Sequence, residues 1–219
     1  MTLLLPSSYA HQTLASPVEL MIMLFVIAII PVVAVSMTSF TRIIVVLGLL
    51  RAALGTASLP PNAVLVALAV MLSAAIMAPT FSAVKREAVV PYQAHRITIG
   101  QALTRAERPM GAFMIRQTRP IDIRAFDRIA GVKPAKNSAP PFEVLVPAFL
   151  TSELRIAFAM GFALALPFAI VDLIVAIVLM SLGMFMVAPN AVSLPIKLLL
   201  FVVADGWTLV AGALAASFR

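Results

Sequence analysis

Long stretches without a charged side chain constrain this chain more than any other feature of its sequence. Four apolar blocks stand out: Leu20 to Thr41, Ala52 to Val84, Ile156 to Val187, and Pro195 to the end of the sequence. The first two blocks carry no charge, the third carries only Asp172, and the fourth carries Lys197 and Asp205 in its interior and Arg219 as its last residue. A helix needs about 20 consecutive apolar residues to cross the hydrocarbon core of a bilayer. Because helices satisfy their own backbone hydrogen bonds in lipid, the blocks predict an all-α, membrane-associated fold.

The composition agrees with this class and excludes several others. Hydrophobic residues make up 62% of the chain and charged residues only 11%, whereas soluble domains are about 25% charged. The absence of cysteine excludes disulfides, thiolate metal sites and cysteine nucleophiles. The formal charge of +7 is spread through an apolar chain with few aromatic residues for base stacking, which argues against binding to nucleic acid.

Prolines and glycines interrupt the apolar blocks and predict broken helices. The segment "GTASLPPN" (55–62) divides the first two apolar helices, which together occupy 20–81. The second of these helices is predicted to begin near Asn62 and to run to about Met77, before Pro79, which is short for a membrane span. Apolar helices three and four occupy 144–219, and Pro167 is expected to kink the third.

Residues 82–143 have a different character and predict a small helical polar insert. This segment holds 11 of the 16 lysines and arginines. Thr98 and Gln101 have the spacing of a capping box and predict a helix start. Asp122 is expected to cap a last short helix, which Gly131 would end.

The N-terminal segment, 1–19, needs its own interpretation. It has no lysine or arginine, and its apolar core is three leucines, far below the roughly 7 to 15 residues of a signal peptide. As written it is not a signal peptide, and it would be the remnant of one if the true start lies upstream.

Several ionisable residues lie inside or beside the apolar blocks. They are Arg42, Arg51, Glu153, Arg155, Asp172, Lys197 and Asp205. A charge at the centre of a lipid-facing helix costs about 2.5 to 3.5 kcal/mol on insertion scales, so such residues are expected to face protein and to pair. The favoured interpretation is structural: Asp172 pairs with a cation of the fourth block or of a neighbouring subunit. A proton relay, and an aspartyl protease using Asp172 and Asp205, are weaker alternatives, and no spacing indicates catalysis, a cofactor or a metal site.

Several long segments together resemble the FliP family of flagellar type III export-gate subunits. They are "MTSFTRIIVVLGLLRAALGT", "PPN", "FMIRQTR", "PAFLTSELRIAF" and "LPFAIVDLIVAIVLMSLGMFMVAPNAVSLPIKLLLFVVADGW". The similarity extends from about Leu20 to the C-terminus, which makes it far more specific than any short motif.

The resemblance implies a non-enzymatic part of a protein-conducting channel in the bacterial inner membrane, at the flagellar basal body. Family members are built from hydrophobic helical hairpins and assemble in several copies, as a pentamer, with FliQ and FliR. FlhB-type and FlhA-type export components are the further partners implied, and unfolded flagellar proteins are the substrates. The family arrangement places 82–143 on the periplasmic side. The positive-inside rule would place it in the cytoplasm, but this rule is weak for loops of about 60 residues.

The resemblance also gives a role to the methionine-rich segment at 183–189. The family's methionine loop points into the pore as a gasket, and it is matched here by Met184, Phe185 and Met186, with Gly183 and Pro189 as loop hinges. Family members commonly have three consecutive methionines, so Phe185 is a departure that stiffens one position. The alternative is that these side chains fill the core, as most methionines at helical spacing do.

Two other functions stay open at this point. One is the paralogous export-gate subunit of a virulence injectisome, which would work by the same mechanics. The other is a small stand-alone polytopic transporter or ion channel, which would need a polar substrate site at the membrane midplane.

Overall fold

The computed structural model describes residues 17–56, 58–131 and 139–218. The chain divides into two compact units, Met1–Ala34 and Val35–Arg219. The predicted segment 1–19 lies almost entirely outside the described residues. The described part of the first unit is helical, because helix α1 (Pro17–Met37) begins there.

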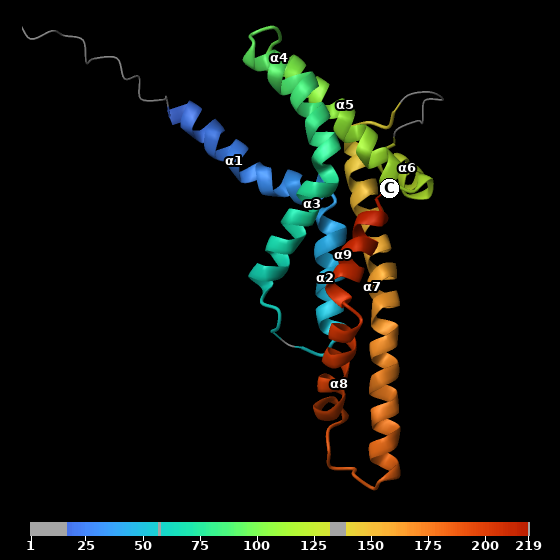
Figure 1. Cartoon of the computed structure of the whole chain (residues 1–219). Helices are drawn as coiled ribbons and strands as arrows, with labels where there is room; N and C mark the ends of the chain where they lie inside the picture. The colour runs from blue at the N-terminus through green and yellow to red at the C-terminus, as the bar shows by residue number, and fades with distance from the viewer. Residues whose placement is uncertain (1–16, 57, 132–138, 219) are drawn as a thin grey trace, which may run out of the picture. The chain divides into compact units, whose positions relative to one another are not determined.

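The second unit consists of helices joined by short turns (Figure 1). In chain order they are α2 (Phe40–Ala53), α3 (Asn62–Val84), the π-helix η1 (Lys85–Val89), α4 (Val90–Gln93), α5 (Ile99–Gln117), α6 (Pro120–Ala130), α7 (Phe142–Ser181), α8 (Pro189–Val203) and α9 (Gly206–Ala216). No strand occurs among the described residues, and the predicted all-α class is confirmed.

Two of the described helices are long and apolar enough to cross a membrane. They are the continuous helical run Asn62–Gln93 and helix α7, and the number of spans rises to four if each bent helix pair counts as one. One such pair is α8 and α9, which are bent by 65° at a break near Asp205. Asp205 has left-handed backbone angles (φ 48°), so the predicted fourth apolar helix is two helices, and the first of them begins at Pro189 rather than Pro195.

The prediction that the second apolar helix ends near Met77 is wrong. Helix α3 continues through Pro79 and leads directly into η1 and α4, which makes a run of 32 residues. A proline inside a helix removes one hydrogen bond, but ending the helix in an apolar setting would leave several backbone groups without partners. The wide turn of η1 lies just before Pro91, a residue that cannot donate a backbone hydrogen bond.

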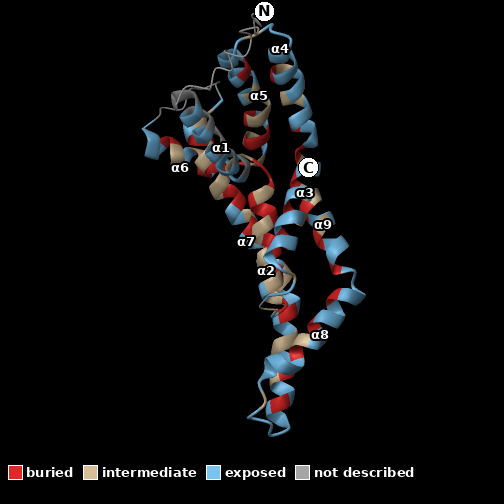
Figure 2. Ribbon diagram, turned by 90° about the vertical axis from the view of Figure 1, so that its left-hand side faces the viewer, coloured by how far each residue is buried: buried red, intermediate tan, exposed pale blue. Residues whose placement is uncertain are grey.

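Helix α7 organises the core of the second unit. It begins at Phe142, two residues before the predicted bound of 144 for the third and fourth apolar helices, and passes through Pro167 without ending. Helix α2 packs along it, and buried residues follow the middle of the unit where these two helices lie (Figure 2).

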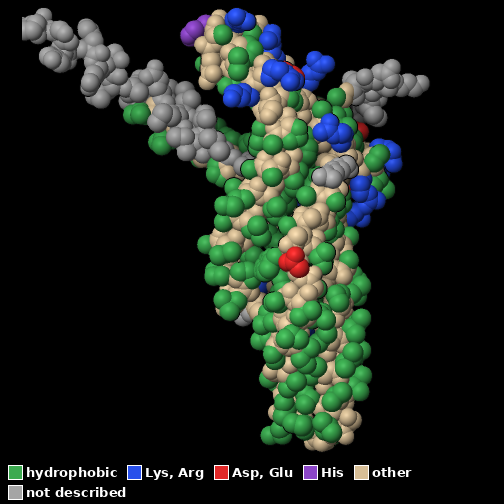
Figure 3. Space-filling model, in the orientation of Figure 1, with side chains coloured by type: hydrophobic (Ala, Val, Ile, Leu, Met, Phe, Trp, Pro, Cys, Tyr) green, Lys and Arg blue, Asp and Glu red, His purple; other side chains and the backbone are tan. Residues whose placement is uncertain are grey.

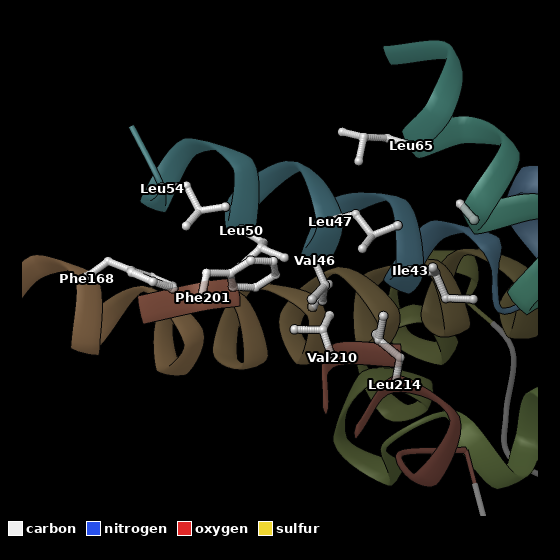
Figure 4. Close-up of a cluster of buried hydrophobic side chains, with 12 residues drawn as sticks. Ile43, Val46, Leu47, Leu50, Leu54, Leu65, Phe168, Phe201, Val210 and Leu214 are labelled. Atoms are coloured by element: carbon white, nitrogen blue, oxygen red, sulfur yellow. The ribbon is translucent and has the colours of Figure 1, made fainter. Parts of the chain in front are cut away.

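The stripe of α2 that packs on the core follows helical spacing: Ile43, Val46, Leu47, Leu50 and Leu54. Figure 4 shows these side chains meeting apolar residues of three other helices, which are Phe168 of α7, Phe201 of α8, and Val210 and Leu214 of α9. All of these residues are buried. The stripe therefore joins the N-terminal part of this unit to its C-terminal helices.

Of the three helix-end predictions for the polar insert, two are confirmed and one is wrong. The Thr98 side chain accepts a hydrogen bond from Gln101 N, and the Gln101 side-chain oxygen accepts one from Thr98 N, so the predicted capping box is confirmed. Gly131 ends α6 with left-handed backbone angles (φ 66°), as predicted. Asp122 is not the cap of α6, because Arg119 occupies that position and Asp122 instead accepts a hydrogen bond from Ser152 Oγ at 2.6 Å.

The contact between α2 and α7 should tolerate no added atom at Gly161. A Cβ there would lie 2.8 Å from Leu49 Cβ and closer still to its Cδ1. We expect Gly161→Ala to push the two helices apart and to lower the free energy of unfolding by about 1 to 3 kcal/mol. Gly48→Ala on α2 is the matched control, because nothing lies within 4 Å of its Cβ position. Thermal unfolding in detergent, followed by circular dichroism, would contradict this packing if both variants matched the parent.

Candidate functional site

The methionine segment forms a tight turn between α7 and α8. Gly183 adopts left-handed angles (φ 77°), Gly183 N donates to Met180 O, and Met184 N donates to Leu179 O at 2.9 Å. This pair of hydrogen bonds is the Schellman arrangement that ends a helix at a glycine. Pro189 then occupies the first turn of α8, where its missing N–H costs nothing.

The side chains of this turn point away from the chain's own core. Met184 is 43% exposed, Phe185 is 79% exposed, and Met186 is fully exposed. The turn lies at the end of the α7–α8 hairpin, far from α5 and α6 (Figure 1). These residues therefore do not fill the core of this chain, and their apolar atoms are available to another surface.

The first buried ion pair joins Arg42 of α2 to Glu153 of α7. Arg42 Nε donates to Glu153 Oε2 at 2.8 Å, and Arg42 Nη2 donates to Glu153 Oε1, so the pair is bidentate. The side chains are 1% and 0% exposed. The remaining guanidinium donors reach Gln117 Oε1 and the backbone and hydroxyl oxygens of Ser217.

The C-terminal end of α9 is held by the same cluster. The Arg42 guanidinium lies 3.7 Å from the centre of the Phe218 ring, and Gln117 Nε2 donates to Phe218 O at 3.1 Å. One arginine thus holds together α2, α5, α7 and the residues that follow α9. Sequence reasoning placed Arg42 in an apolar setting but did not assign it a partner.

The second ion pair joins Asp172 of α7 to Lys197 of α8. Lys197 Nζ lies 2.5 Å from Asp172 Oδ2 and also donates to Ala53 O, while Ser193 Oγ donates to Asp172 Oδ1. The lysine side chain is 5% exposed and the aspartate side chain 38% exposed. The structure thus brings together a carboxylate of the third apolar block and a cation of the fourth.

The other predicted charges are placed differently. Arg155 is exposed and lies 4.0 Å from Asp122, at the limit of an ion pair. Asp205 is exposed at the break between α8 and α9, and none of the ion pairs among the described residues includes it. Within the described ranges, no group of three His, Asp or Glu side chains could hold a metal ion.

The sequence profile of the FliP family matches residues 23–214. The chain belongs to the FliP family. A protein of Pectobacterium carotovorum named flagellar biosynthetic protein FliP is 46% identical over 98% of this chain and 83% of that protein. A protein of the same name from Bacillus subtilis is 44% identical over 97% of this chain and 96% of that protein.

Other relatives are longer than this chain. In two Buchnera aphidicola proteins of the same name, at 43% and 44% identity, the matched region spans only 59% and 55% of the relative. The family match covers α2 to α8 and nearly all of α9, so both ion pairs and the methionine turn lie within the part that defines the FliP family.

Removing one member of the buried Arg42–Glu153 pair should be more damaging than removing both. Glu153→Gln would leave the Arg42 guanidinium buried without its counter-charge, and we expect a loss of about 3 to 5 kcal/mol in the free energy of unfolding. Arg42→Met combined with Glu153→Leu should cost less than either single change, because no buried charge remains. The control is Arg155→Gln, an exposed cation on the same helix, which should change stability by no more than about 0.5 kcal/mol. Equal losses for Glu153→Gln and Arg155→Gln in detergent unfolding would contradict the role of the pair.

Proposed function

We propose that this chain is a non-enzymatic subunit of the flagellar protein export apparatus in the bacterial inner membrane. In this proposal it forms, in several copies and with FliQ- and FliR-type partners, the channel through which unfolded flagellar proteins leave the cell. The observation that carries the proposal is the match along nearly the whole length of the Bacillus subtilis protein named flagellar biosynthetic protein FliP.

The exposed apolar surface of the α7–α8 hairpin supports an assembled state. Phe158, Phe162, Leu166, Ile170 and Leu173 of α7 are all exposed in the single chain. Large exposed apolar patches mark contacts with other proteins or with lipid. In the proposal, neighbouring copies and the small hydrophobic partners cover them.

The methionine turn is suited to form the constriction of such a channel, which must close the pore and yet deform. A pore for unfolded chains needs a constriction that excludes water when idle and deforms around any side chain in transit. Apolar constrictions close pores by dewetting, and unbranched thioether side chains adapt to irregular surroundings. Met184, Phe185 and Met186 have this chemistry and are exposed on a turn. We infer that one turn from each copy forms the gasket.

Two rival functions are less well supported. The relatives from Pectobacterium and Bacillus carry flagellar names, which favours the flagellar branch over the injectisome branch. A stand-alone transporter would need polar groups free to bind substrate at the midplane. In the described part of the chain, the most buried charges, Arg42, Glu153 and Lys197, are engaged in ion pairs.

Deleting the gene in the bacterium that encodes this chain should abolish flagellar export. We expect hook and filament proteins to be lost from the culture medium while they remain detectable inside the cells. Secretion through any injectisome in the same cells is the control and should continue. Normal flagellar export with loss of injectisome secretion would favour the paralogue, and normal secretion by both routes would favour the stand-alone transporter.

Replacing both methionines of the turn should make the idle channel leak. Met184→Ala with Met186→Ala removes apolar volume from the proposed constriction, so resting ion conductance should rise in membrane current recordings of the assembled complex. Assembly should persist, because neither side chain packs in the core of the chain. Phe185→Met, which restores the common family pattern, is the matched control and should not leak. A double variant that assembles and conducts no more than the parent would exclude the gasket role.

A further inference from the structure

The exposed charges of the polar insert are mostly positive. Among the described residues 82–131, all nine lysines and arginines are exposed, whereas two of the four carboxylates, Asp122 and Asp127, are buried. Figure 3 shows Lys and Arg side chains gathering around α4, α5 and α6, while the rest of the visible face of this unit is mainly hydrophobic. This end of the unit therefore presents a positive surface whose counter-charges are turned inward.

Part of this surface is hollowed into a pocket of about 380 Å³ between η1, α4 and α5. Its lining consists of Arg86, Glu87, Pro91, Arg105 and Arg108. Arg86 Nη2 lies 3.4 Å from Glu87 Oε1, and this exposed contact is weak. The side chains of Arg105 and Arg108 make no ion pair or hydrogen bond within the described ranges. Three cations and one carboxylate thus face the pocket, and two of the cations are unpaired.

The position of the pocket along the long helix indicates its depth in a membrane. The residues of α3 from Asn62 to Val84 carry no charge, and 23 helical residues extend about 34 Å. This length matches a hydrocarbon core of about 30 Å. The first cations after it, Lys85 and Arg86, then fall at the level of the lipid headgroups.

Residues beside the pocket have the character of a membrane interface. Tyr92, nearly two turns after the first cations, is exposed, and tyrosine is enriched at the membrane–water interface. The planar guanidinium group of arginine can donate two parallel hydrogen bonds to a phosphate group. The carboxylate of Glu87 would repel an anion, but the three arginines give the lining a net charge of +2.

We propose that the pocket of Arg86, Arg105 and Arg108 binds the phosphate headgroup of an anionic phospholipid. This site is separate from the methionine turn and does not depend on the proposed export function. It would anchor the polar insert to the membrane surface at a defined depth.

The test compares lipids on the purified full chain in nonionic detergent, by native mass spectrometry. We expect dioleoylphosphatidylglycerol to bind more tightly than dioleoylphosphatidylcholine. Arg105→Gln with Arg108→Gln should weaken phosphatidylglycerol binding about 30-fold, as expected for two cations beside an anionic headgroup. The matched control is Arg124→Gln with Arg128→Gln on α6, which removes the same charge outside the pocket and should leave binding within about twofold of the parent.

Four results would overturn the proposal. Equal affinity for the two lipids would exclude a headgroup site, and equal losses in the two double variants would indicate diffuse attraction rather than a pocket. Displacement of the lipid by excess inorganic phosphate would identify free phosphate as the ligand. Tighter binding of a polyglutamate peptide at the same arginines would indicate an acidic protein partner. If Arg105→Gln with Arg108→Gln does not fold, the single change Arg86→Gln, also exposed, permits the same comparisons.

Discussion

The bidentate pair of Arg42 and Glu153 is the interaction on which the second unit most depends. Both side chains are buried, and a buried charge is tolerated only when its partner and its remaining hydrogen bonds are in place. Arg42 meets Glu153 across 111 residues of sequence and Ser217 across 175. The positions of α2, α7 and the chain's C-terminal end are therefore coupled, because a shift in any of them would leave a desolvated charge.

The two ion pairs have different relations to solvent. Glu153 is buried away from solvent, and both of its carboxylate oxygens accept hydrogen bonds from Arg42. Asp172 is partly exposed, although its partner Lys197 is buried. The first pair fixes the packing of α2 on α7, and the second holds α8 against α7 at a place that another molecule could reach. A carboxylate at such an edge can keep its internal partner and still contact a neighbouring subunit.

Sequence reasoning succeeded where the controlling interactions are local. The capping box at Thr98 and the glycine stop at Gly131 depend on residues within one helical turn, so their spacing was sufficient. It failed at Pro79, where the cost of ending a helix in apolar surroundings outweighs one lost hydrogen bond.

Long-range partners were only partly accessible from sequence. Asp122 has the residue type of a helix cap, but it bonds to Ser152, 30 residues away. Arg42 was recognised as a charge that needs a partner, yet nothing in the linear sequence distinguishes Glu153 from the other acids. The pairing becomes evident only once α2 lies along α7. The exposure of the methionine turn is likewise a result of the fold, since Gly183 and Pro189 predict a turn but not which way its side chains point.

The length of α7 connects these features to assembly. Its 40 residues extend about 60 Å, roughly twice the hydrocarbon core of a bilayer. One end of α7 adjoins the basic insert, which suits headgroups and water. The other end carries Met184, Phe185 and Met186 on an exposed turn, which suits neither water nor an ordinary loop. If the insert lies at the membrane surface, the turn is about 60 Å away and must extend beyond the far side of the hydrocarbon core. Lipid cannot cover it there, and in the proposed assembly the equivalent turns of other copies cover it with side chains of the same chemistry.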